Sequence, residues 1–110
     1  MTNVELFKNK NGEIVKFLIK GHSDFADAGS DILCAAVSTA ATMTLNGILE
    51  VAKVTVGYEV RDAYIECILP DNLLEEEQKK CSLLIDTLVL TLRDLEQQYK
   101  KHITITELEV

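Results

Sequence analysis

A histidine and a cysteine lie close together in the stretch GHSDFADAGSDILCAA, which covers residues 21–36. His22 directly follows an apolar run, and Cys34 lies near the start of the next one. A cysteine thiolate can attack an amide carbonyl, and a neighbouring imidazolium can protonate the departing amine. These two residue types therefore predict peptide-bond hydrolysis, with Cys34 as the nucleophile and His22 as the base.

The residues around Cys34 predict that it lies in the first turn of a helix. Ser30 is a residue type that caps helices, and apolar residues recur at helical spacing after it, so we expect a helix from Asp31 to about Leu49 or Glu50. The first turn of a helix has unpaired backbone N–H groups, which favour a thiolate and can hold an oxyanion. We therefore expect the nucleophile and the oxyanion hole to share this helix end.

A purely structural interpretation of the same cysteine is also open. Free cysteine is among the most buried residue types, and Cys34 followed by Ala-Ala-Val on a core helix can serve packing alone. We expect that role for Cys67, which lies in an alternating strand, and for Cys81, which lies on an apolar helix stripe. The three cysteines lack short paired spacings, so neither a disulfide framework nor a zinc site is indicated.

Two further polar residues share a helix face with Cys34, namely Asp31 and Ser38. Asp31 can orient the imidazole or cap the helix, and capping is the simpler role. Ser38 can equally be a small residue at a close contact. Asp24 and Asp27 add two carboxylates to the same stretch, but the spacing is not that of an EF-hand. We expect solvated loop residues there and no metal site.

Two β-hairpins, two helices and a last strand must position these residues. Runs of apolar and β-branched residues at 4–7 and 14–19 flank an Asn-Gly turn and predict the first hairpin. Two more such runs, at 53–60 and 63–70, meet at Arg61-Asp62 and predict the second.

The remaining elements are a long helix and a closing strand. Asn72 and Glu75 form an Asn-x-x-Glu cap for a helix with one apolar stripe, and residues 102–110 alternate as a strand does. The order is ββαββαβ, which predicts the α+β class: a mixed or antiparallel sheet packed with two helices. Two sheet edges remain, so a homodimer is expected through an edge or through an apolar helix.

Composition limits the partners of the protein. The chain has 110 residues, 47% of them hydrophobic, and a net charge of -7, which predicts a single domain over residues 1–110. The acidic balance disfavours nucleic acid and anionic membranes as direct partners and suits a basic peptide or protein. The N-terminus lacks a signal-peptide pattern and no segment is expected to reach the length of a membrane span, so we expect a cytoplasmic location.

The segment GHSDFADAGSDILCAAVS, residues 21–38, resembles the signature of the ribosomal-processing cysteine protease family, Prp. That signature is roughly Gly-His-Ala, a short variable loop, and Gly-x-Asp-Ile/Val-x-Cys-Ala-Ala-Val-Ser. The late segment LLIDTLVLTLRDLEQQY, the order of elements and the chain length are also similar to the family. The resemblance implies a small, cytosolic, typically dimeric cysteine protease. It also implies a substrate, the basic N-terminal extension of ribosomal protein L twenty-seven, and no cofactor.

The resemblance also assigns roles to residues of the motif. It makes His22 the base and Cys34 the nucleophile, and it gives supporting roles to Asp31 and Ser38. Two glycines of the motif, Gly21 and Gly29, would flank a mobile loop, and Ser23 stands where alanine is commoner in the family.

Two other hypotheses compete with a protease. The first is a non-catalytic, ribosome-associated binding or assembly module of the same fold, which an intact His-Cys pair disfavours. The second is a redox sensor at Cys34, which the lack of an evident resolving cysteine disfavours.

Overall fold

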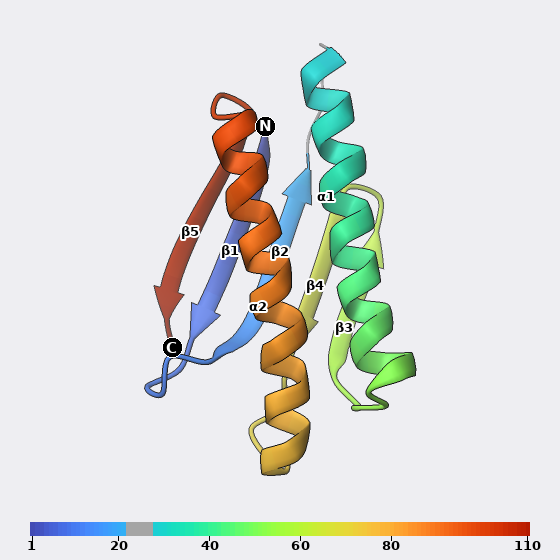
Figure 1. Ribbon diagram of the computed structural model, residues 1–110, viewed down its shortest axis with the longest axis vertical. Coiled ribbons are helices and arrows are strands. Elements are labelled where there is room, and N and C mark those ends of the chain that lie inside the picture. Colours follow the sequence, from blue (N-terminus) through green and yellow to red (C-terminus); the bar gives the residue numbers. More distant parts are fainter. Residues whose placement is uncertain (22–27) are drawn as a thin grey trace.

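Five strands form one mixed sheet, and both helices lie on the same face of it (Figure 1). This computed structural model describes residues 1–21 and 28–110, and of residues 28–31 it describes the backbone alone. The elements are β1 (Thr2–Lys8), β2 (Ile14–Gly21), α1 (Ala28–Asn46), the π-helical turn η1 (Gly47–Val51), β3 (Gly57–Arg61), β4 (Tyr64–Ile68), α2 (Glu75–Gln98) and β5 (Ile103–Glu109). The predicted order ββαββαβ and the α+β class are confirmed.

The sheet order is β3-β4-β2-β1-β5, with β1 and β5 parallel and all other neighbours antiparallel. Thr2 at the start of β1 pairs with Gly21 at the end of β2, and it also pairs with Ile103 at the start of β5. Three strand ends therefore meet at one end of the sheet, which is also where α1 begins (Figure 1).

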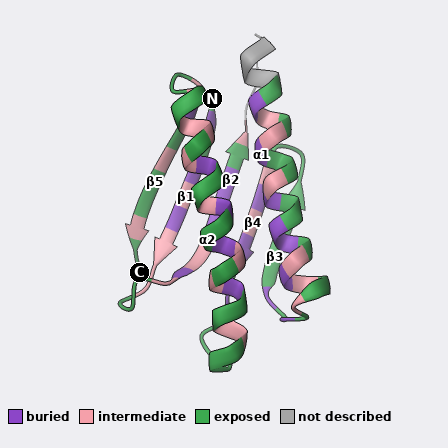
Figure 2. Cartoon of the chain, in the orientation of Figure 1, coloured by how far each residue is buried: buried purple, intermediate pink, exposed green. Residues whose placement is uncertain are grey.

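The core lies between the sheet and the two helices (Figure 2). Strand residues alternate between faces, so every second residue of β1 and β2 points at the helices. Each helix contributes one stripe of buried residues to this core. The stripe of α1 is Leu33, Val37, Ala41 and Leu45, and the stripe of α2 is Cys81, Ile85, Leu88 and Leu92. Each large apolar side chain buried in this way contributes about 1.5–3 kcal/mol.

The predicted start of the first helix, at Asp31, is wrong, because residues 28–30 are already helical. The backbone is already helical at Ala28, so Ser30 lies inside the helix instead of capping it, and Cys34 lies beyond the first turn. Alanine is the best helix former, and a glycine or serine costs only about 1 kcal/mol or less within a helix. Residue types alone therefore could not place the cap.

The predicted cap of the second helix is also wrong. The helix begins at Glu75, and the N–H of Leu74 donates to Oε1 of Glu77 at 2.9 Å. The sequence has three consecutive glutamates, residues 75–77, and any of them could have made this contact, so the residue types alone did not place the cap. Leu73 packs against the core, which holds the segment before Leu74 outside the helix and leaves Asn72 without a capping role.

The third strand is shorter than predicted. Residues 53–56 lie outside the sheet, although Val54 and Val56 are buried in the core. Lys53 adopts a φ of 57°, which turns the chain away from an extended path. The β-rich composition of this run therefore reflects burial of valines and not strand pairing.

One helical segment, Ile32–Val51, is long and apolar enough to cross a membrane by length and composition, with a mean hydropathy of 1.6. The expectation that no segment reaches that length is therefore wrong. The buried stripe of this segment packs on the sheet and on α2, as an apolar core helix does.

Candidate active site

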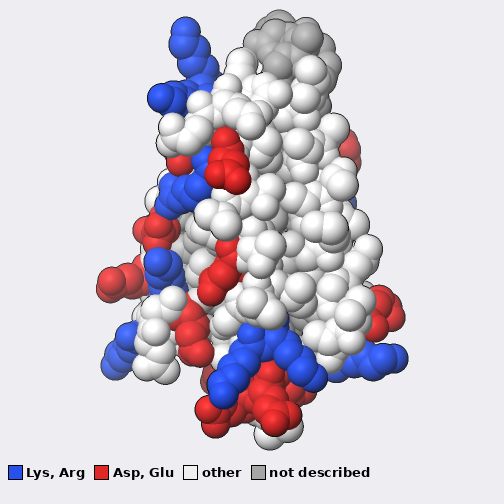
Figure 3. Space-filling model, viewed as in Figure 1, with Lys and Arg blue, Asp and Glu red and all other residues white. Residues whose placement is uncertain are grey.

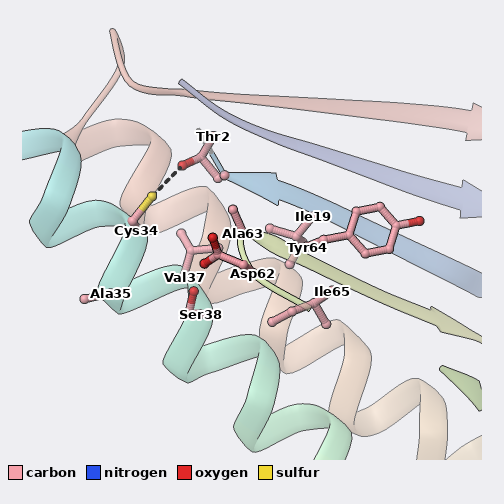
Figure 4. A pocket seen from close by; sticks show the side chains of 11 residues that line it. Thr2, Ile19, Cys34, Ala35, Val37, Ser38, Asp62, Ala63, Tyr64 and Ile65 are labelled. Carbon is pink, nitrogen blue, oxygen red and sulfur yellow. Dashed lines mark hydrogen bonds between the residues drawn. The ribbon is translucent and has the colours of Figure 1, made fainter. Parts of the chain in front are cut away.

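A pocket opens between α1, the end of β2 and the turn that joins β3 to β4 (Figure 4). Its volume is about 260 Å³. The residues that line it are Thr2, Ile19, Gly21, Cys34, Ala35, Val37, Ser38, Asp62, Ala63, Tyr64 and Ile65. Cys34 is half-buried in its wall, whereas Cys67 and Cys81 are fully buried elsewhere. One of the three thiols in the chain is thus open to a ligand.

Two strand residues fix the position of the Cys34 sulfur. The Oγ1 atom of Thr2 lies 3.8 Å from Sγ of Cys34, a contact in which either atom can be the donor (Figure 4). On Gly21, a Cβ atom would lie only 3.2 Å from the same sulfur. The thiol is therefore held close to the backbone of β2 and beside the hydroxyl of β1.

Backbone hydrogen bonds anchor both of these strand residues. The N–H of Thr2 donates to the carbonyl of His102 at 2.8 Å, and the N–H of Gly21 donates to the carbonyl of Ala63 at 2.9 Å. Thr2 is itself only 3% exposed. The floor of the pocket is therefore set by sheet geometry.

The structure brings together three of the predicted site residues. Gly21, Cys34 and Ser38 all line the pocket, and Ser38 lies one helical turn after Cys34. Gly29 lies in α1. The base predicted at His22 lies outside the described residues, as do Asp24, Asp27 and the side chain of Asp31.

The expected overlap of nucleophile and helix start is not seen. Only the first four N–H groups of an α-helix lack intrahelical acceptors, and the backbone is already helical at Ala28, six residues before Cys34. Cys34 lies beyond the first turn, although helical side chains lean toward the N-terminus and bring Sγ nearer to that end. The stabilisation of a thiolate by the helix dipole falls off beyond the first turn. The neighbouring hydroxyl of Thr2 is therefore a more important hydrogen-bond donor to the Cys34 sulfur.

Asp31 is likewise not an N-cap residue, because the backbone is already helical from Ala28. Its predicted capping role is therefore wrong.

The other two cysteines have the packing role expected from the sequence. Burial raises the pKa of Cys67 to about 12, with a smaller contribution from Cys81. The pKa of Cys81 is also raised, first by burial and then by the charge of Glu77. Both groups stay protonated near neutral pH, which makes them poor nucleophiles.

Sequence reasoning missed Thr2 and Asp62 as members of the site. A threonine at the start of a strand and an aspartate in a turn are both common, so their types carry no signal. Their positions follow from sheet register: the first hairpin sets Thr2 beside Gly21, and the second sets its own turn beside the end of β2. The hairpin registers were the signal that could have found them.

Comparisons with known proteins match this chain to cysteine proteases. The family model described as cysteine protease Prp matches residues 1–104. A protein of Bacillus subtilis named ribosomal processing cysteine protease Prp is 26% identical over 96% of each chain. Its namesake from Staphylococcus aureus is 23% identical, over 96% of this chain and 97% of the relative.

Two solved structures share the fold over nearly the whole chain. A protein from Streptococcus mutans superimposes with a TM-score of 0.85 at 24% identity, covering 100% of this chain and 96% of the other. The Staphylococcus aureus Prp protease in complex with a substrate peptide gives 0.85 at 19% identity, covering 97% and 99%. Because the family model spans nearly all of the sequence and a thiol lies open in the pocket, the chain belongs to the cysteine protease Prp family and is a cysteine protease.

Proposed function

We propose that the protein is a cysteine endopeptidase that removes a basic N-terminal extension from ribosomal protein L twenty-seven. The main support is that Cys34, the one cysteine of the three that is not buried, lies with its thiol in the wall of an open pocket. The curated relatives are named ribosomal processing proteases, which supports a ribosomal substrate. The net charge of -7 supports a basic one.

The proposed reaction uses Cys34 and His22 as a dyad. The Cys34 thiolate attacks the scissile carbonyl carbon, and backbone N–H groups hold the oxygen as it becomes negative. The C–N bond then breaks, and the His22 imidazolium gives its proton to the departing amine. His22 next takes a proton from water, whose oxygen attacks the thioester and releases the acid product and the thiolate.

Asp31 acts in this proposal by orienting His22. The support is that the backbone is already helical at Ala28, which removes the capping alternative for Asp31. A carboxylate that accepts from one nitrogen of an imidazole stabilises its protonated form. Ser38 acts as part of the pocket wall one turn after Cys34.

The same proposal includes a homodimer in the cytoplasm that binds neither nucleic acid nor membrane. The net charge of -7 supports the absence of nucleic acid and anionic lipid as partners. The segment from Ile32 to Leu49 contains no charged residue, and Figure 3 shows an uncharged surface over α1. A face of this kind supports contact between two copies that carry like net charges.

Intact-mass analysis tests the activity. A peptide that spans the extension junction is incubated with the unaltered protein, with Cys34→Ser and with Cys81→Ala. Cys81 is buried away from the pocket, so its variant is the matched control and should still cut.

We expect one cut with the unaltered chain and with Cys81→Ala, and none with Cys34→Ser. Equal cutting by Cys34→Ser would remove Cys34 as the nucleophile. Lack of any cut, with the folded ribosomal protein as well as with the peptide, would favour a docking module.

A further inference from the structure

The turn between β3 and β4 brings a carboxylate to the pocket that holds Cys34. Asp62 lies in this turn, and it lines the same cavity as Cys34 and Ser38. In Figure 4 its carboxylate points from the hairpin toward α1, the helix that carries both of those residues. An acidic group therefore belongs to the wall beside the thiol.

The position of this turn relative to the sulfur is fixed by backbone contacts. Ala63, the residue after Asp62, adopts a φ of 55°, and its carbonyl accepts the N–H of Gly21 at 2.9 Å. Gly21 in turn lies against Sγ of Cys34, where an added Cβ would be 3.2 Å from the sulfur. The carboxylate is thus presented by an anchored turn.

Among the described residues, the neighbouring cations form no ion pair with Asp62. Nε of Arg61 donates to Oε2 of Glu59 at 3.0 Å, and the guanidinium lies over the ring of Tyr64 at 3.8 Å. Lys20 and Arg61 line the adjacent cleft, which Asp62 also lines, but neither of them lines the pocket of Cys34. Among the residues that the structure describes, none forms an ion pair with Asp62, so its charge is available to a ligand.

The rest of the lining suits a long basic side chain. Apolar groups of Ile19, Val37 and Ile65 form the walls. Lysine and arginine combine a hydrocarbon stem with a charged head, so they can cover such walls while the head reaches an acid. The volume of about 260 Å³ is below the roughly 300–1,000 Å³ of pockets that enclose whole small ligands. The pocket therefore suits one side chain of a longer peptide.

We propose that Asp62 makes this pocket a subsite for a lysine or arginine side chain of the substrate, close to the scissile bond. The proposal rests on the proposed function, since it takes Cys34 as the nucleophile. Asp62 is then a specificity-determining residue, and Ser38 lies where it can add a hydrogen bond to the bound cation.

Paired peptides test the subsite. In junction peptides, each residue near the scissile bond is replaced in turn by lysine, by glutamine or by glutamate, and kcat/KM is measured for each. We expect the unaltered protein to prefer lysine over glutamine about tenfold at one position, because a hydrogen bond between two charged groups is stronger than one that involves a neutral amide. Asp62→Asn should reduce that preference to less than about twofold, and Asp62→Lys should favour glutamate.

Asp71→Asn is the matched control, because it changes the net charge equally at a separate cavity. It should keep the lysine preference. The preference of the unaltered protein should also weaken as salt is raised.

An unchanged preference in Asp62→Asn, or an equal loss in Asp71→Asn, would overturn the subsite while leaving the protease intact. Cleavage of no peptide at all by the unaltered protein would instead overturn the proposed function, and the subsite with it.

Discussion

The sulfur of Cys34 is held from two sides by strand residues. Thr2 places a buried hydroxyl 3.8 Å from it, and Gly21 lets the backbone of β2 approach it. A thiolate has no proton to donate, so in the ionised state the hydroxyl of Thr2 is the donor. Hydrogen bonds to an ionised acceptor are stronger than neutral ones. Thr2 is therefore a positioning residue for the nucleophile.

Thr2→Val replaces this hydroxyl by a methyl group of similar shape. We expect kcat/KM to fall by a factor of about two to ten, since a hydrogen bond contributes about 0.5–1.5 kcal/mol. The pH profile for alkylation of Cys34 by iodoacetamide should move to higher pH, because the thiolate loses a donor. Thr2→Ser keeps the hydroxyl and should restore both properties. Identical alkylation profiles for Thr2→Val and the unaltered protein would contradict this role.

Residues close in sequence were predicted better than residues brought together by the sheet. Cys34 and Ser38 share a helix face by their spacing alone, and both line the pocket. Thr2 and Asp62 reach the same pocket from different strands, through pairings that local patterns do not encode. The side chain predicted to be the base, His22, stays a prediction from the motif.

At the scale of elements, the site depends on how closely α1 approaches the end of β2. Periodicity predicted both elements, because one face of each is apolar and buried. It could not predict the start of α1, because Ala28, Gly29 and Ser30 all tolerate a helix. The helical residues before Asp31 place Cys34 beyond the first turn, so hydrogen-bond donors from the sheet matter more to its sulfur.

Gly21→Ala tests the close approach of these two elements. The new Cβ would lie 3.2 Å from Sγ of Cys34, so the sulfur or the helix must shift. We expect kcat/KM to fall at least about tenfold and the free energy of unfolding to fall by about 1–3 kcal/mol, as for overpacked sites. Gly57→Ala is the matched control, since its Cβ would meet Ile68 at 3.6 Å, an ordinary contact. Peptide cleavage and urea denaturation measure both effects, and equal activity in the two variants would argue against the approach.

At the scale of the whole molecule, charge is unevenly distributed over the surface. Figure 3 shows charged side chains beside a broad uncharged face over α1. Along α1 and η1, Met43 and Val51 are 67% and 82% exposed, and both line one shallow groove. Exposed apolar surface of this kind marks sites of protein contact. The proposed homodimer would use this face.

Met43→Glu places a charge on the proposed dimer face and should shift the protein from dimer to monomer. Light scattering coupled to size-exclusion chromatography measures the mass directly. Gln97→Glu adds the same charge at an exposed position of α2 and should leave the dimer intact. A monomer in the unaltered protein, or a dimer that survives Met43→Glu, would refute this interface.

The central claim is that Cys34 forms the covalent bond to the substrate. Its most direct test is rapid acid quenching of the protein with junction peptide, followed by mass analysis of the protein. We predict an added mass equal to the amino-terminal product less one water, carried as a thioester on Cys34. Cleavage that proceeds with no adduct on Cys34, or with an adduct on another residue, would contradict the account.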